Sequence, residues 1–385
     1  MPFSEAAQDL LQRPITLERL ELLELAVPQV EAFRSAIGER RERRALYVRW
    51  YDTDGAWGIG ECSCRPDPFF NGEFVAGARQ VLRDHVLPVL ARQATLADLH
   101  QQAQRFRGWP FTLAALLDAA WDLGRRRGDA DLLTHLEPPR LDAVPVGISL
   151  GIFDTPDEAV ERVRSAVAEG YPRVKMKIAP SMDPAPLAAV REAFPDLHLG
   201  FDANGSCTDD DIPFLVGLGD LNPAMLEQPF APTRLDHCLE LRRQAPELPI
   251  CLDESIVDLG SLVTAHRLGA LDEVNLKPGR VGGQQQVCEI LAYCRTEGIP
   301  VWIGGMFETG IGRNANLRVA ARLPDAEAHD LSPSQRYFTR DVVQDPAVMD
   351  NGRVAIVDDM PPVIDEDAFA DLLVQRDVLP LDKGK

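Results

Sequence analysis

The chain has 385 residues, 45% hydrophobic and 26% charged, an ordinary globular composition with room for one large domain and a smaller one. Its formal net charge of −20 would repel phosphate backbones and anionic lipid surfaces, so we expect neither nucleic acid nor a membrane as a partner. No apolar stretch is long enough to span a bilayer, and the seven cysteines show neither paired metal-site spacing nor a disulfide framework. A reducing, cytoplasmic location is therefore expected.

The first 140 residues or so contain strands followed by helices, which predicts an α+β unit. Apolar positions from 73 to 127 recur at three- and four-residue intervals, as in amphipathic helices. Asp52–Gly55 predicts a hairpin turn, and the mostly basic segment Glu39–Arg44 is expected in a turn between two strands. Gly58 and Gly60 lack the third glycine and the following helix of a dinucleotide-binding loop. The expected strands are Leu17–Pro28, Ala45–Tyr51 and Ala56–Glu61.

From Val144 onward, short apolar runs alternate with amphipathic helices, and this alternation predicts a parallel sheet. Eight strands fit before Leu331. They are expected at Val144–Leu150, Val174–Ile178, Leu197–Asp202, Met225–Glu227, Ile250–Asp253, Glu273–Lys277, Pro300–Gly304 and near His329–Leu331.

Five charged residues fall at the ends of successive strands, 24 to 26 residues apart: Lys177, Asp202, Glu227, Asp253 and Lys277. Repeated strand–helix units close into a TIM-type barrel, whose active-site residues lie at the carboxyl ends of the strands. An open doubly wound sheet is the alternative, but it would not gather five successive strand ends around one point. We therefore expect these side chains to converge on one mouth of a barrel.

Three carboxylates on adjacent strands form a hard oxygen-ligand set, which suits Mg²⁺ or Mn²⁺. A substrate carboxylate on such a metal has its adjacent C–H acidified, and loss of that proton gives an enediolate. Lys175 and Lys177 lie two apart on one strand and share a face, so a neighbouring cation favours a neutral lysine base. A single Asp at a strand end is more often a helix cap, and a single Lys is usually a surface residue. Asp253 is favoured as a ligand over Glu254 by its spacing.

Several strings around these residues resemble the enolase superfamily, muconate-cycloisomerase subgroup: Lys175-Met-Lys177, Phe201-Asp-Ala-Asn204, Leu226-Glu-Gln-Pro229, Leu252-Asp-Glu-Ser255 and Asn275-Leu-Lys-Pro-Gly-Arg-Val-Gly-Gly283. Two more, from Trp302 to Arg313 and from Asp330 to Tyr337, are similar to the branch of o-succinylbenzoate synthases and N-acylamino acid (N-succinylamino acid) racemases. The resemblance runs from about Val27 to Pro361.

This resemblance implies an α/β fold: a modified (β/α)₇β TIM barrel at residues 141–339 and an α+β capping domain. The capping domain comprises residues 1–140, with 340–385 packing back onto it. The resemblance also implies a small-molecule carboxylate substrate and a homo-oligomer.

The resemblance assigns a role to each site residue. Metal ligands are Asp202, Glu227 and Asp253. Lys177 is the general base on one face and Lys277 the acid/base or cation on the other, with Lys175 supporting its neighbour electrostatically. The substrate-binding positions are Ser149, Asn204, Gly305, Met306 and, in the first of two cap loops (Phe33–Gly38 and Pro66–Glu73), Phe33.

The sequence departs from the family pattern at Leu132–Arg140, at Asn314-Ala-Asn316 and at Cys62–Pro68, which affects the substrate rather than the metal or the lysines. A synthase and a racemase therefore both fit, with the synthase leading. A muconate-type cycloisomerase or a dipeptide epimerase is the alternative enzyme. Epimerases usually carry an Asp-x-Asp motif where this chain has Gly304–Glu308. A non-catalytic, small-molecule-binding barrel is the remaining alternative.

Overall fold

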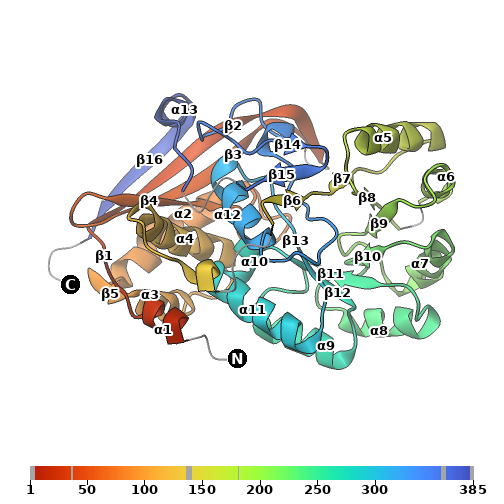
Figure 1. The fold of residues 1–385 in the computed structure, drawn as a ribbon, viewed down its shortest axis with the longest axis horizontal. Coiled ribbons are helices and arrows are strands. Elements are labelled where there is room, and N and C mark those ends of the chain that lie inside the picture. Colours follow the sequence, from red (N-terminus) through yellow and green to blue (C-terminus); the bar gives the residue numbers. More distant parts are fainter. Residues whose placement is uncertain (1–4, 36–37, 136–140, 181, 357–360, 382–385) are drawn as a thin grey trace.

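In a computed structural model of the protein, an antiparallel sheet with its helices lies beside a ring of parallel strands (Figure 1). The structure describes residues 5–35, 38–135, 141–180, 182–356 and 361–381, except for the side chains of residues 31–40 and 135. Within these residues, no helix is both long and apolar enough to cross a membrane. All seven cysteines are buried and free.

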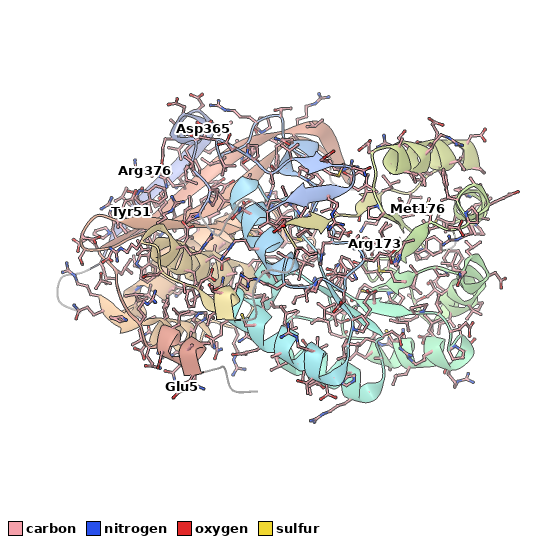
Figure 2. The ribbon with its side chains drawn as sticks, viewed as in Figure 1. Glu5, Tyr51, Arg173, Met176, Asp365 and Arg376 are labelled. Atoms are coloured by element: carbon pink, nitrogen blue, oxygen red, sulfur yellow. The ribbon has the colours of Figure 1, made fainter. Side chains whose placement is uncertain are left out.

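The antiparallel sheet has the strand order β16-β2-β3-β4. Its strands are β2 (Arg19–Ser35), β3 (Gly38–Tyr51), β4 (Trp57–Cys62) and β16 (Leu373–Pro380). The C-terminal strand thus pairs with the first long strand of the chain, and Arg376 lies 2.8 Å from Glu21 across that pair. Figure 2 labels Arg376 and Tyr51 on this sheet, and Arg173 and Met176 on the barrel strand β8.

One expectation for this sheet is wrong. The basic segment Glu39–Arg44 is not a turn: it lies inside β3, paired with the last part of β2. The ladder extends beyond the apolar run because backbone hydrogen bonds hold it regardless of side chain. Opposite charges also compensate the arginines, since Arg43 pairs with Glu61 and Arg44 with Glu42. The three strands and the turn at Asp52–Gly55 are confirmed.

Helices cover this sheet, and the expectation of a helical region from 73 to 127 is largely confirmed. A short strand pair, β1 (Pro14–Thr16) with β5 (Gln93–Thr95), interrupts it. The helices of this half are α1 (Glu5–Leu11), α2 (Val75–Val81), α3 (Leu96–Ala103), α4 (Pro110–Arg126) and, from the C-terminal tail, α13 (Glu366–Leu372). Shorter helical turns throughout the chain are η1 (Leu82–Val86), η2 (Leu87–Val89), η3 (Leu132–His135), η4 (Asp209–Asp211), η5 (Leu218–Leu221) and η6 (Ser334–Arg336).

The seven parallel strands lie in sequence order around the ring, which is the TIM-type arrangement that the alternation of elements predicted. They are β7 (Ile148–Leu150), β8 (Arg173–Lys177), β9 (His198–Asp202), β10 (Met225–Glu227), β11 (Ile250–Leu252), β12 (Glu273–Leu276) and β13 (Val301–Ile303). The helices between and after them, several of which Figure 1 shows outside the ring, are α5 (Pro156–Ala168), α6 (Ala185–Ala193), α7 (Ile212–Gly217), α8 (Leu235–Gln244), α9 (Leu259–Leu268), α10 (Pro278–Val281), α11 (Gln284–Glu297) and α12 (Gly310–Ala320).

The first expected strand, Val144–Leu150, is divided into two. Its start is β6 (Ala143–Pro145), which pairs with the hairpin β14 (Met349–Asp350) and β15 (Arg353–Ala355), while its end is β7 of the ring. The change of partner occurs at Val146 and Gly147, and one apolar run therefore serves two sheets.

The segment around His329 closes the ring, as expected for an eighth strand. The backbone of His329 bridges Val146 in parallel and accepts a 2.8 Å hydrogen bond from Gly147. On the other side, Asp330 N–H donates to the Ile303 carbonyl of β13 at 3.0 Å. The (β/α)₇β barrel with an α+β cap is thereby confirmed.

Two glycines allow β4 to lie directly against α4. A Cβ atom on Gly58 would stand 2.2 Å from the Ala119 carbonyl oxygen, and one on Gly60 would stand 2.1 Å from that of Ala115. Real atoms do not approach so closely. These glycines therefore permit a close backbone approach within the cap.

We expect Gly60→Ala to lower the free energy of unfolding by about 2 kcal/mol or more, because the methyl group must displace the α4 backbone. Thermal unfolding measures the effect. Gly217→Ala is the matched control, since a Cβ there meets nothing within 4 Å and the residue is helical. Equal behaviour of the two variants would contradict the close packing.

Two buried histidines make stability depend on pH. Burial and the nearby charge of Arg173 together lower the pKa of His329 to about 3, and burial lowers the pKa of His100 to about 4. Both pKa values are depressed, so the unfolded chain binds more protons, and stability is full above pH 6.5 and falls as the pH drops below it.

Each histidine should therefore lower the free energy of unfolding by about 1.4 kcal/mol for each pH unit below 6.5. We expect His329→Asn, whose amide oxygen can still accept the hydrogen bond from Ile303 N–H, to flatten the fall of the thermal midpoint between pH 6.5 and 4.5. His100→Gln should flatten it by a similar amount, and the double variant by twice as much. An unchanged slope in both single variants would show that other groups cause the acid sensitivity.

Candidate active site

Three carboxylates gather where neighbouring strands end. Asp202 is the last residue of β9, Glu227 is the last of β10, and Asp253 directly follows β11. Each is at most 1% exposed. Because parallel neighbours end at the same edge, the strand register alone brings the three side chains together.

Lysines from two more strands meet these acids. Lys175 Nζ lies 2.7 Å from Glu227 and 3.4 Å from Asp202, and Lys177 Nζ lies 2.7 Å from the same oxygen of Asp202. Lys277, after β12, lies 2.7 Å from Asp253. The lysines from β8 and β12 thus approach the acid cluster from different strands.

The charge of this cluster is unevenly compensated. Burial raises the pKa of Glu227 to about 8, and the neighbouring charges of Asp202 and Asp253 add to this effect. Burial also favours a protonated Asp253, but Arg280 and Lys277 together hold its pKa well below the usual range. Glu227 is therefore the acid of this cluster whose charge is compensated least.

In the described structure, no three His, Cys, Asp or Glu side chains are arranged as a preformed metal site. All six carboxylate oxygens of the cluster have protein donors instead: the Asp202 oxygens bind the two β8 lysines and Asn204 N–H, those of Glu227 bind Lys175 and Asn275, and those of Asp253 bind Lys277 and Arg280. The donor chemistry nevertheless fits a hard divalent cation, since carboxylate oxygens are its preferred ligands. The raised pKa of Glu227 indicates where additional positive charge would stabilise the cluster.

Two expected substrate-binding residues touch this network. Asn204 Oδ1 accepts a hydrogen bond from Lys177, and its Nδ2 donates to Glu254 at 3.1 Å. The other oxygen of Glu254 is buried without a hydrogen-bond partner among the described residues. Ser149 is the exposed middle residue of β7, and its hydroxyl donates to Asp330 at 3.2 Å.

Two more lie in the loop that follows β13. Gly305 has no room for a side chain, because a Cβ would stand 2.6 Å from the Arg313 guanidinium. Met306 is half-buried, its N–H donating to Glu308 at 2.7 Å and its carbonyl accepting from Arg313 at 2.9 Å. The side chain of Phe33 lies outside the described residues.

Three site residues were given no role by the sequence analysis. Arg280 is buried and binds Asp253 while donating to the carbonyl of Asn275 at 2.6 Å. Asn275 in turn donates from Nδ2 to Glu227 at 2.9 Å. Asp330 lies 2.7 Å from Lys175 and 2.8 Å from Arg173. A signal existed for Asp330, which ends the eighth strand about one repeat after Gly304.

The cap reaches this site through its second loop. Phe70, within the expected cap loop Pro66–Glu73, has its ring centre 5.3 Å from Lys277 Nζ. The same ring packs edge-on against Phe111 of α4, and Phe69 beside it is exposed. The loop thus presents apolar surface next to the charged cluster.

Comparisons with known proteins identify this architecture. Residues 158–361 match the family of enolase C-terminal domain-like proteins. The chain is 36% identical to an N-succinylamino acid racemase from Amycolatopsis, over 91% of this chain and 97% of the relative. It is 34% identical to an o-succinylbenzoate synthase from Enterococcus faecalis, over 89% of this chain and 93% of the relative. A solved enolase-superfamily member from Listeria innocua superposes with a TM-score of 0.90 at 28% identity, over 96% of this chain and all of that one. With its acids and lysines at the ends of the barrel strands, the chain belongs to the enolase superfamily, in the mandelate racemase and muconate lactonizing subgroup.

Proposed function

We propose that this enzyme removes the proton next to the carboxylate of a small substrate. The leading assignment is an o-succinylbenzoate synthase, and an N-acylamino acid racemase is the second. The observation that carries this proposal is that Lys177 and Lys277 each bind a different acid of one buried cluster. Such a pair can serve a substrate held between them. The two relatives named above carry these two activities in their names.

Enolase-superfamily members typically use a divalent metal. Asp202, Glu227 and Asp253 would hold it here, as Mg²⁺ or Mn²⁺. When bound, it would supply positive charge to the substrate carboxylate as charge develops there. The resulting acidity of the adjacent C–H brings the proton within reach of a lysine base.

Lys177 is assigned as the base in both reactions. In the dehydration it takes the α-proton and returns it to the departing hydroxyl group, which leaves as water. Lys277 then contributes positive charge only. In the racemisation, Lys177 and Lys277 exchange the α-proton from opposite faces, so both must change protonation state. Lys175 keeps its charge, because Asp330, Glu227 and Asp202 outweigh its burial and raise its pKa.

The proposal also includes the residues that bind the substrate and the division into domains. The substrate-binding residues are Ser149, Asn204, Gly305, Met306 and Phe33. Residues 1–140 with 340–385 form the cap over a barrel of residues 141–339. A dipeptide epimerase is disfavoured because Gly304–Glu308 offers no Asp-x-Asp pair for a peptide amine.

Metal binding is tested by thermal unfolding. Mg²⁺ at 100 times its Kd should add about 2.7 kcal/mol to the free energy of unfolding. The thermal midpoint should rise accordingly, and chelation should reverse the rise. Glu227→Gln should abolish this response, because the acid with the least compensated charge is lost. Asp131→Asn is the control, a buried acid that pairs with Arg318 outside the site. A response to Mg²⁺ that survives in Glu227→Gln would remove that residue from the metal site.

The two reactions are separated by Lys277→Arg. Arginine keeps the charge but cannot act as a base near neutral pH, so racemisation should fall far more than dehydration. Interconversion of the two enantiomers of an N-succinyl amino acid measures the first, because Lys177 alone could still exchange the α-hydrogen of one enantiomer in D₂O. A direct ring-dehydration assay measures the second. Lys177→Ala should abolish both. Equal losses in Lys277→Arg would contradict the two roles, and the absence of exchange in the unmodified enzyme would exclude the racemase.

A further inference from the structure

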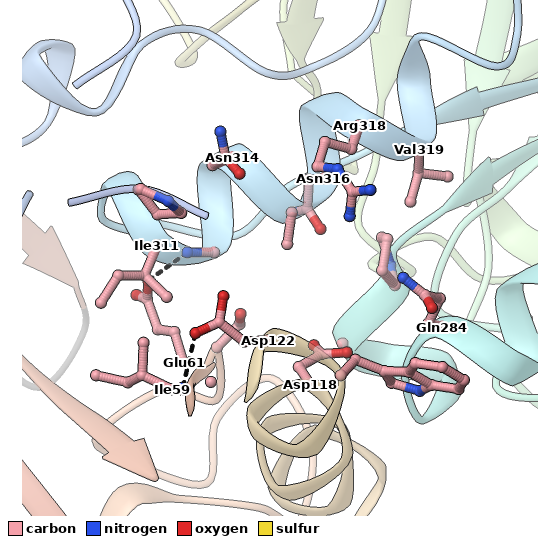
Figure 3. Close-up of a pocket in the computed structure, with 18 of the residues that line it drawn as sticks. Ile59, Glu61, Asp118, Asp122, Gln284, Ile311, Asn314, Asn316, Arg318 and Val319 are labelled. Carbon is pink, nitrogen blue, oxygen red and sulfur yellow. Dashed lines mark hydrogen bonds between the residues drawn. The ribbon is translucent and has the colours of Figure 1, made fainter. Parts of the chain in front are cut away.

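Glu61 lies near the end of β4 in the cap sheet, yet most of its hydrogen-bond partners belong to the barrel. Its carboxylate accepts hydrogen bonds from Thr309 N–H at 3.0 Å, from the Thr309 hydroxyl at 2.8 Å and from Gly312 N–H at 3.0 Å. Figure 3 shows Glu61 facing the start of α12, beside Ile311, with a dashed line to that helix. One buried carboxylate thus connects the two halves of the molecule.

These contacts satisfy the free N–H groups at the start of α12. Thr309 is the N-cap residue but makes no capping bond of its own, and its hydroxyl donates to Glu61. The next N–H, that of Gly310, donates to Asp341 at 2.9 Å. The first N–H groups of α12 therefore donate to carboxylates from distant segments. The position of the helix start thus depends on the position of the cap sheet.

Thr309 also ends the loop that follows β13, which contains Gly305 and Met306. Glu308 accepts from Met306 N–H at 2.7 Å, and Arg313 donates to the Met306 carbonyl while lying 3.0 Å from Glu308. The loop is consequently rigid between Met306 and Thr309. A displacement of Thr309 would carry the loop with it.

The strand that bears Glu61 leads directly into the other wall of the site. After β4 the chain enters the cap loop Pro66–Glu73, which places Phe70 beside Lys277. Glu73 holds the far end of this loop by accepting from Phe111 N–H and Thr112 N–H, both at 2.9 Å. Glu61 therefore connects the strand that leads into the cap loop with the end of the loop after β13.

The charge of Glu61 is built into this arrangement. Its side chain is fully buried 3.2 Å from Arg43. Burial raises the pKa of Glu61, while Arg43 and the hydrogen bonds from Thr309 oppose that rise. A neutral amide would turn N–H groups toward the N–H donors of α12 and would leave Arg43 without its partner.

We propose that Glu61 is a positioning residue, which holds the cap loop and the loop after β13 in register around the substrate. This rests on the proposed function for its effect on turnover. No hydrogen bond or ion pair of the described residues joins Glu61 to Lys177, Lys277 or the three clustered acids. Its loss should therefore weaken substrate binding while leaving the proton transfer itself intact.

The test is Glu61→Gln, with KM, kcat and hydrogen–deuterium exchange measured together. We expect KM to rise about tenfold, kcat to change less than twofold, and the amides from 304 to 312 to exchange faster. The midpoint shift caused by Mg²⁺ should be unchanged. Asp122→Asn is the matched control, because Asp122 is also buried and holds β4 through Ile59 N–H at 3.0 Å, but from α4 within the cap (Figure 3).

A second variant covers the case in which Glu61→Gln does not fold. Thr309→Val removes the 2.8 Å hydrogen bond from the barrel side and should raise KM in the same direction by a smaller factor. In the double variant, the two effects should be less than additive, since both break one contact. Additive effects would argue against a shared role.

The proposal is overturned if KM and loop exchange stay unchanged in Glu61→Gln, if the loop loosens without a change in KM, or if Asp122→Asn has the same effects. Loss of kcat with an unchanged KM would also overturn it. An unmodified enzyme that turns over neither substrate would instead contradict the proposed function, and loop exchange would still decide whether Glu61 holds the loop.

Discussion

The barrel mouth depends on one constraint: buried carboxylates must be compensated by charge or hydrogen bonds, because an isolated buried charge is very costly. Asp202, Glu227, Asp253 and Asp330 all end strands or follow them directly, and each binds a buried or half-buried cation. The lysines to which we assign roles in catalysis are the same groups that compensate the buried acids. Loss of one partner would therefore disturb both the fold and the site.

The compensation is incomplete at the centre, and this has a chemical consequence. Glu227 carries a raised pKa although Lys175 lies 2.7 Å away, because burial and two neighbouring acids outweigh one ammonium group. A divalent cation held by these acids would supply the positive charge that Glu227 lacks.

The cap and the barrel are not independent layers. Gly58 and Gly60 let β4 lie against α4, while Glu61 of the same strand accepts hydrogen bonds from the start of the barrel helix α12. β4 thereby transmits the position of the cap to the loop carrying Gly305 and Met306. In the proposed function, the acids and lysines decide which bond is broken, and these loops decide which substrate fits.

Much of the fold and the charged site could be predicted from the sequence, because both follow from local periodicity. A repeat of about 25 residues fixes a strand–helix unit, and a charged residue at the end of each unit must lie at one edge of a parallel sheet. No knowledge of distant contacts was needed for Lys177, Asp202, Glu227, Asp253 or Lys277. Their approach to one another depends only on the register of neighbouring strands.

What only the tertiary structure decided were partners far apart in the chain. Glu39–Arg44 is a strand because it pairs with the last part of β2, with Glu61 compensating Arg43, and Val144–Leu150 is divided between two sheets because its start pairs with β15 near the C-terminus. Arg280 and Asp330 gained their roles from the acid and lysine they face. Local pattern reports which face of an element is buried, but it does not report what that face is buried against, and that choice is made by contacts across hundreds of residues.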